Sequence, residues 1–269
     1  MYRYKSLSIG FLFFLSQLSS RAQDFSAYMK LEFSKGKKIL FYRFLQPQDY
    51  DSTKKYPLII FLHGAGLKGN DNEKQLKVGG AYFLRDSNRI QYPAYVLFPQ
   101  CPVDDFWNYL DIKYELKEDS GLLKPAVKEI LFPFNDTPTV TTGLLLALID
   151  SLRNSKNIRS TDIYIGGASQ GAMGVWDIVA RKPDWFAAAF PICGWGNTDV
   201  ITYFSKKTKF WIFHGKDDDV IPAKYSREFY KKMLRKGYNV KYSEYPGVKH
   251  DSWNNTFLEK DLLRWMFMD

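Results

Sequence analysis

The stretch from Ile163 to Gly174, which reads IYIGGASQGAMG, constrains the fold of this chain more than any other. Its first half has the β-branched and aromatic residues of a buried strand, and its second half has the pattern of a helix. Ser169 lies between them, with glycines two positions before and two positions after it. The same residue types also make ordinary turns. The order Gly-x-Ser-x-Gly at a strand-to-helix junction, however, predicts a nucleophile elbow, a sharp turn that lifts the serine hydroxyl above the edge of a sheet.

Three other segments contain the partners that such a serine needs. Residues 57–66 are a continuous apolar run that ends in a glycine-rich turn, which is typical of a parallel strand covered on both faces. Residues 210–222 begin as a second buried strand and end in an acidic loop. Residues 240–245 alternate like a half-buried strand, and His250 follows closely. The order along the chain is therefore serine, acid, histidine.

Only one of the three histidines follows the acidic loop, and this is His250. A general base must lie within hydrogen-bonding distance of the serine and must be oriented by a carboxylate. His63 and His214 each precede a glycine at the end of a buried strand, which favours a structural role for both. We therefore expect His250 to be the base for Ser169 rather than a solvated loop residue.

The acidic loop contains three adjacent carboxylates, Asp217, Asp218 and Asp219. Neighbouring loop residues point in different directions, so no more than one of them normally reaches the histidine. The other two would be solvated, or would cap the helix expected to begin near Ala223. The residues alone leave the choice open.

From His214 to Pro222 the loop resembles the His-Gly-x-x-Asp-x-x-x-Pro motif of serine esterases in the α/β-hydrolase superfamily. In that motif the acid is the third residue after the glycine. The resemblance therefore points to Asp218, with Asp217 as the alternative.

The resemblance extends over residues 38–250, which is most of the chain. It is to a group of secreted bacterial esterases, some of them described as predicted peptidases and others akin to feruloyl and acetylxylan esterases. The segments that carry it are residues 56–72, 92–107 and 186–194. One departure is Gln170-Gly171-Ala172, where such relatives more often have Met-Gly-Gly. The backbone N–H of residue 170 can still donate, but the pocket wall changes.

This resemblance implies a catalytic triad of Ser169, Asp218 and His250. It also implies an oxyanion hole formed by the backbone N–H groups of Ala65 and Gln170. The sequence contains no metal-ligand cluster, phosphate loop or dinucleotide fingerprint. We therefore expect no metal and no cofactor.

Alternation of strand and helix patterns predicts the α/β class, and here an α/β-hydrolase fold with a mostly parallel, doubly wound sheet flanked by helices. Helices are expected at residues 144–152 and 171–181, before and after the elbow strand. The length fits a single catalytic domain, residues 23–269. Residues 102–138 are long enough to form a lid or one wall of the pocket.

The first 22 residues have the composition of a secretory signal peptide. Arg3 and Lys5 precede an apolar run at residues 7–18, and small residues end at Ala22. We expect cleavage before Gln23 and a secreted or periplasmic protein. The apolar run is too short to span a bilayer, so no stable membrane anchor is expected.

The formal net charge of +9 raises the question of nucleic-acid binding. The lysines and arginines are scattered along the chain and accompany no recognition motif, which is typical of solvated faces. We expect a small-molecule or polysaccharide ester as the partner and no nucleic acid. The oligomeric state is left open.

The two cysteines, Cys101 and Cys193, follow strands that the usual α/β-hydrolase order separates by two others. Three strand spacings amount to about 14 Å, which exceeds the reach of a disulfide. We expect two free, buried thiols.

Three tryptophans are expected near the catalytic edge of the sheet: Trp107, Trp195 and Trp253. Each lies shortly after a strand or beside a loop of the expected triad. Core packing and pocket lining are the two interpretations, and binding sites commonly have aromatic walls. We assign these three as candidate substrate-binding residues.

The sequence thus predicts a secreted serine carboxylic-ester hydrolase that forms an acyl-enzyme, with acetyl or feruloyl esters of plant polysaccharide as candidate substrates. A serine peptidase with the same triad is one alternative. A non-catalytic carbohydrate-binding relative is the other.

Overall fold

The computed structural model describes residues 23–119 and 122–268. The expected signal peptide, residues 1–22, lies outside the described residues. None of the helices in the described ranges reaches the length and apolar content that a bilayer crossing requires.

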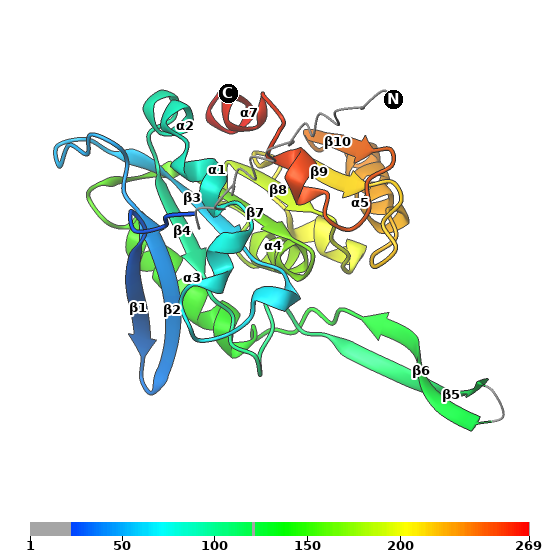
Figure 1. The fold of residues 1–269 in the computed structure, drawn as a ribbon. Coiled ribbons are helices and arrows are strands. Elements are labelled where there is room, and N and C mark those ends of the chain that lie inside the picture. Colours follow the sequence, from blue (N-terminus) through cyan, green and yellow to red (C-terminus); the bar gives the residue numbers. More distant parts are fainter. Residues whose placement is uncertain (1–22, 120–121, 269) are drawn as a thin grey trace, which may run out of the picture.

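One eight-stranded sheet forms the centre of the molecule (Figure 1). Its strands, in spatial order, are β1 (Met29–Lys35), β2 (Lys38–Leu45), β4 (Tyr95–Pro99), β3 (Tyr56–Leu62), β7 (Ile158–Ala168), β8 (Ala188–Ile192), β9 (Lys209–Gly215) and β10 (Val240–Tyr245). The first three strands pair antiparallel, and all later neighbours pair parallel. The expected α/β-hydrolase fold with a mostly parallel sheet is confirmed.

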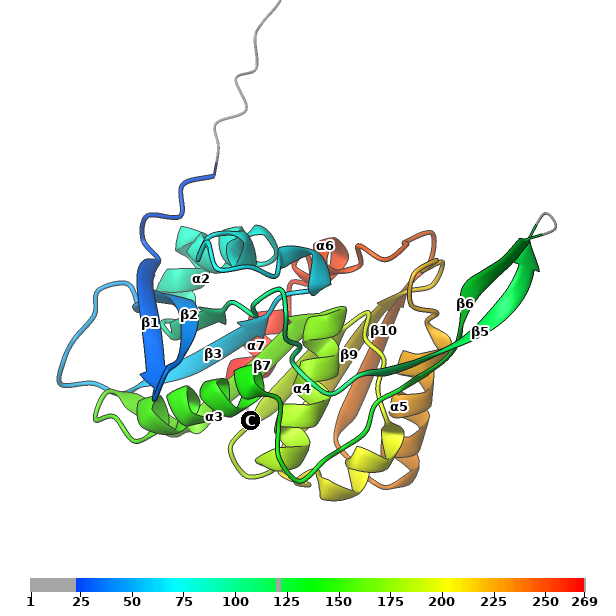
Figure 2. The same ribbon diagram turned by 90° about the horizontal axis from the view of Figure 1, so that it is seen from below.

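Helices cover both faces of this sheet (Figure 2). The longer ones, α3 (Val140–Arg153), α4 (Gln170–Arg181) and α5 (Lys224–Arg235), pack on one face. The shorter ones, α1 (Gly80–Leu84), α2 (Asp86–Gln91), α6 (Trp253–Thr256) and α7 (Leu262–Phe267), lie towards the other. The described ranges also contain three 3₁₀ turns, η1 (Ala65–Leu67), η2 (Lys74–Lys77) and η3 (Thr198–Tyr203).

The central strand β3 shows why its sequence is apolar throughout. Leu58 and Ile60 belong to the core beneath α3 and α4, whereas Ile59 and Phe61 belong to the core on the opposite face. Because successive side chains of a strand point to opposite faces, a strand covered on both sides needs apolar residues at every position.

The segment at residues 102–138 contains an unexpected two-stranded hairpin, β5 (Asp111–Asp119) and β6 (Leu122–Leu131). The hairpin projects away from the body rather than folding over the edge of the sheet (Figures 1 and 2). Tyr114 and Leu116 on β5 are correspondingly exposed. The lid interpretation is therefore wrong for the hairpin. Its base does form part of a cavity wall, as described below.

Cys101 follows β4 and Cys193 follows β8, with β3 and β7 between them. Both thiols are free and buried, in agreement with the expectation from strand order.

Candidate active site

Ser169 occupies the turn between β7 and α4 in a strained conformation. Its backbone angles are φ +55° and ψ −119°. A Cβ at Gly171 would lie 2.0 Å from the Leu62 carbonyl oxygen, and one at Gly167 would lie 2.5 Å from the Gly171 backbone. Neither position can hold a side chain, so the sequence argument for small residues at these two sites is confirmed. Backbone strain of this kind is retained where the surrounding structure enforces it, commonly at functional sites.

Three side chains that are far apart in the sequence form one hydrogen-bonded row at the carboxyl edge of the sheet. His250 Nε2 lies 3.0 Å from Ser169 Oγ, and His250 Nδ1 lies 2.8 Å from Asp218 Oδ2. The backbone N–H groups of Val220 and Ile221 donate to the other oxygen, Asp218 Oδ1, at 2.9 and 2.8 Å. The Asp218 side chain has no exposed surface, while the His250 side chain is 20% exposed. The row therefore runs from a buried acid to a serine that solvent can reach.

The neighbouring carboxylates have other partners. Asp217 Oδ2 accepts the Gly247 backbone N–H at 2.9 Å, and Asp219 forms an exposed ion pair with Lys249 at 2.8 Å. Both contacts hold the loop after β9 against the loop after β10. Of the three adjacent acids, Asp218 is the one whose carboxylate contacts His250, which favours it over Asp217 as the acid of the expected triad.

His214, the next-to-last residue of β9, lies behind Asp218. Its Nε2 is 2.8 Å from the Ile221 carbonyl oxygen and 3.1 Å from Asp218 Oδ2, and its Nδ1 is 2.7 Å from Ser226 Oγ. Two oxygen acceptors face Nε2, so the proton of the neutral ring is on Nε2 and Ser226 donates to Nδ1. Burial lowers the pKa of His214 and favours this neutral form. The sequence identified His214 as structural but gave no sign of its contact with the acid.

The two expected oxyanion-hole donors border Ser169. Gln170 is the first residue of α4, and Ala65 is the first residue of η1 at the end of β3. Neither N–H donates a hydrogen bond to a backbone group within the described ranges. Gly64, next to Ala65, comes so close that a Cβ there would lie 3.4 Å from the Ser169 Cβ. Unused backbone donors beside a serine hydroxyl are the feature that an oxyanion hole requires.

His63 holds this loop in place. Its Nδ1 donates to the Gly64 carbonyl oxygen at 2.7 Å, and its Nε2 accepts the Cys101 backbone N–H at 3.0 Å. The Trp107 indole N–H donates to the His63 carbonyl oxygen at 3.0 Å. His63 is fully buried, and burial lowers its pKa to about 4, so the ring is neutral.

The assignment of Trp107 as a substrate-binding residue is wrong, because its side chain is fully buried. It packs against Gly174 of α4 and lies edge-on to the His63 ring, with 5.3 Å between ring centroids. A loop position without periodicity gave no sequence signal to separate pocket from core.

The other two tryptophans remain partly accessible. Trp253 lies edge-on to the His250 ring, with centroids 5.7 Å apart. Trp195 stacks on Tyr225, with centroids 4.1 Å apart, and lines a cavity of about 500 Å³. Both therefore remain candidates for substrate contact.

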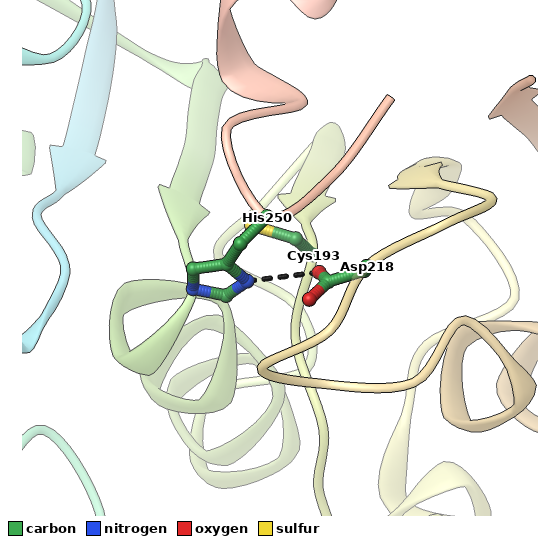
Figure 3. Close-up of side chains that lie close together, drawn as sticks. All are labelled: Cys193, Asp218 and His250. Atoms are coloured by element: carbon green, nitrogen blue, oxygen red, sulfur yellow. Dashed lines mark hydrogen bonds and ion pairs between the residues drawn. The ribbon is translucent and has the colours of Figure 1, made fainter. Parts of the chain in front are cut away.

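Cys193 lies beside His250 and Asp218 (Figure 3). Possible ligand atoms of Cys193, Asp218 and His250 all lie within 4.8 Å of one another. Burial raises the pKa of the Cys193 thiol to about 12, so the thiolate that a metal prefers is absent at neutral pH. His250 and Asp218 already use the facing atoms for each other. We therefore assign Cys193 to packing behind the histidine.

Several known proteins are similar to this chain in sequence or in structure. Residues 138–260 match the family described as Phospholipase/Carboxylesterase. An uncharacterized secreted protein of Arthroderma benhamiae is 24% identical over 249 residues, which cover 80% of this chain and 23% of that protein. A thermostable esterase of known crystal structure is 30% identical, with a TM-score of 0.76 over 90% of this chain and 63% of that one. The chain thus spans less than two thirds of both relatives.

A more distant structure shows the same fold. The CE1 ferulic acid esterase AmCE1/Fae1A from Anaeromyces mucronatus, solved with ferulic acid, has a TM-score of 0.57 at 13% identity, over 88% of this chain and 89% of that one. Sheet order, elbow geometry and these similarities agree: the chain has the α/β-hydrolase fold and is similar to esterases with that fold.

Proposed function

We propose that this protein is a secreted serine esterase in which Ser169 is the nucleophile, His250 the general base and Asp218 the acid that orients it. The observation that carries the proposal is the hydrogen-bonded row from Ser169 Oγ through His250 to Asp218, at 3.0 and 2.8 Å. Both distances lie within the range that proton transfer and tautomer control require.

The proposed reaction has two halves. Ser169 Oγ attacks the ester carbonyl carbon while its proton passes to His250 Nε2, and Asp218 stabilises the charged imidazole. The oxyanion faces the N–H groups of Ala65 and Gln170. His250 then gives the proton to the leaving alcohol, and the acyl-enzyme remains. Water, deprotonated by His250, attacks the acyl-enzyme and releases the carboxylic acid and the free serine.

Acetyl or feruloyl esters of plant polysaccharide are the proposed substrates. The partly accessible aromatic rings of Trp253, which contacts His250, and of Trp195, two residues after Cys193, support this choice, because aromatic walls suit aryl and sugar groups. The described fold is shared with a ferulic acid esterase bound to ferulic acid. The signal-peptide pattern at residues 1–22, together with a relative described as secreted, supports export.

Turnover by the purified protein tests the proposal. We expect hydrolysis of p-nitrophenyl acetate, methyl ferulate and acetylated xylan, and covalent labelling by a fluorophosphonate probe. Ser169→Ala should abolish both turnover and labelling while leaving the thermal transition in place. An acyl-peptide p-nitroanilide included in the same series tests the peptidase alternative, and preferential cleavage of this anilide would replace the esterase assignment. An absence of any turnover or labelling would favour a non-catalytic role.

A further inference from the structure

A cavity of about 500 Å³ lies between the base of the hairpin, the loop after β8 and the start of α5. This volume is within the range of small-molecule sites. Its walls include Phe132 from the hairpin base, Trp195 from the loop and Tyr225 from α5. Among the described residues, these are segments that the catalytic row itself does not use.

Two contacts connect the walls of the cavity to the elements that hold Ser169 and Asp218. Gly194 precedes Trp195 and packs so closely on α4 that a Cβ there would lie 2.4 Å from the Ala172 Cβ, one turn after Ser169. Ser226, next to Tyr225, contacts His214 at 2.7 Å. Two walls of the cavity are therefore packed against the elements that hold the serine and the acid.

Strand order shows which part of an ester would reach this cavity. The oxyanion loop follows β3, on one side of the elbow strand β7. The cavity loop follows β8, and His250 follows β10, both on the other side. Because His250 must protonate the leaving oxygen, the alcohol lies on the His250 side of the serine. The cavity is on the alcohol side.

The aromatic walls form a flat, ordered surface. Trp195 stacks on Tyr225 with 18° between the rings, and Phe132 meets Trp195 edge-on with centroids 5.0 Å apart. These two contacts order the Trp195 ring, which remains partly exposed. Such a platform suits the C–H face of a sugar ring or another flat group.

Charge narrows the ligand class further. The lining contains three carboxylates, Asp111, Asp199 and Glu228, and no lysine or arginine. Within the described ranges, Glu228 pairs with Lys232 at 3.3 Å, whereas Asp111 and Asp199 have no ion pair. An anionic ligand would face these carboxylates without a cation in the lining to offset them, although the protein as a whole is basic.

Two lysines neighbour the lining without belonging to it. Lys232 pairs with Glu228, and Lys224 Nζ lies 5.0 Å from the centre of the Tyr225 ring, so a cationic ligand would meet these charges as well as the carboxylates of Asp111 and Asp199. Asn197 Oδ1 accepts the Asp199 N–H at 2.9 Å, which leaves the Asn197 amide as a donor. Carboxylate acceptors, an amide donor and an aromatic platform together suit hydroxyl groups on an uncharged ring.

We infer that this cavity binds the alcohol part of the substrate as an uncharged, hydroxyl-rich sugar and disfavours a sugar that carries a carboxylate. The inference rests on the proposed esterase function. In this inference, Trp195 binds the sugar ring, and Asp199 repels a sugar that carries a carboxylate.

Four esters measured with the full mature chain test this inference. They are p-nitrophenyl acetate, an acetylated neutral xylo-oligosaccharide, the same oligosaccharide bearing a glucuronic acid branch, and a choline ester. Among the neutral oligosaccharide, the branched oligosaccharide and the choline ester, the wild-type kcat/KM should be highest for the neutral oligosaccharide. Trp195→Ala should lower the ratio of neutral oligosaccharide to p-nitrophenyl acetate turnover about tenfold, through KM.

Asp199→Lys should raise the ratio of branched to neutral oligosaccharide turnover about fivefold, and added salt should reduce that change. Asp184→Lys makes the same charge reversal at an exposed position outside the cavity lining and should leave the ratio as in the wild type. Equal turnover of neutral and branched oligosaccharides by all variants would overturn the inference. Preference for the choline ester would do the same in favour of a cation site. If the wild-type protein does not hydrolyse p-nitrophenyl acetate, the proposed function itself is contradicted.

Discussion

His214 Nε2 lies 3.1 Å from Asp218 Oδ2, the same oxygen that accepts the His250 N–H at 2.8 Å. With two backbone donors on Oδ1, the buried carboxylate has four donors around it. These contacts fix the plane of the carboxylate and spread its charge. His214 is therefore a positioning residue that acts on His250 through the acid.

Removing this second donor should change the pH dependence of catalysis. His214→Leu leaves Asp218 Oδ2 with His250 as its single side-chain partner, so the carboxylate attracts the charged imidazole more strongly. We expect the acid limb of the kcat/KM profile to move to higher pH and kcat/KM to fall about 10- to 100-fold, as for a lost hydrogen bond to a charged group. His214→Gln retains a donor and should recover most of the loss. An unchanged pH profile in His214→Leu would leave His214 with a packing role alone.

The nucleophile assignment predicts a large loss in Ser169→Ala. Removal of a triad nucleophile should lower ester turnover by about 10³-fold or more. The melting temperature should change little, because alanine fits the same turn. Turnover near that of the wild type would place the nucleophile elsewhere.

The loop geometry predicts different effects for the three adjacent acids. Asp218→Asn should lower kcat by about 10³- to 10⁴-fold, because the amide cannot hold the required His250 tautomer. Asp217→Asn and Asp219→Asn, which alter loop contacts at the surface, serve as matched controls and should stay within about threefold of wild type. A larger loss in Asp217→Asn than in Asp218→Asn would contradict the assignment of the acid.

Burial of Trp107 predicts a stability defect rather than altered substrate selectivity. Trp107→Ala should lower the free energy of unfolding by about 3–5 kcal/mol, through lost packing and a cavity. Trp107→Phe keeps part of the packing but loses the hydrogen bond to the His63 carbonyl, at a cost of about 1 kcal/mol for that bond. Urea unfolding curves measure both. Selective loss of bulky substrates at wild-type stability would restore Trp107 to the pocket.

Two buried neutral histidines predict that stability falls as the solution becomes acidic. Burial lowers the pKa of His63 to about 4 and also lowers that of His214, whereas both titrate near 6.5 when unfolded. Above that pH both states are neutral and stability is complete. Below it the unfolded chain takes up protons that the folded protein excludes, at up to about 1.4 kcal/mol per pH unit for each histidine. Urea unfolding at pH 8, 7, 6 and 5 measures the slope. His63→Gln should reduce this slope between pH 6 and 5, and an unchanged slope in that variant would exclude His63 as a cause.

Local sequence was sufficient wherever the physical requirement is itself local. The elbow could be predicted because neighbouring backbone atoms come so close to positions 167 and 171 that only glycine fits at either one. Strand β3 could be predicted because burial on both faces demands an unbroken apolar run. The chain order of Ser169, the acidic loop and His250, with the superfamily resemblance, predicted which residue types would meet.

Other features depended on contacts between distant segments, which no local pattern encodes. The hairpin β5–β6 was not expected, because it buries little of β5 and so lacks a core-facing periodicity. Trp107 is core and Trp195 is accessible, although both follow strands, because α4 and the oxyanion loop cover only the first.

The sequence by itself determined the α/β class, the elbow at Ser169 and the identity of His250 as the one histidine that comes after the acidic loop. The tertiary structure decided that Asp218 rather than Asp217 faces His250, that His214 supports this acid, and that the base of the hairpin forms one wall of an aromatic, acidic cavity. The physical reason is range. Backbone sterics and burial periodicity act between residues a few positions apart, whereas side-chain direction in a loop is set by partners such as Gly247 and Lys249, about 30 residues away along the chain but adjacent in space.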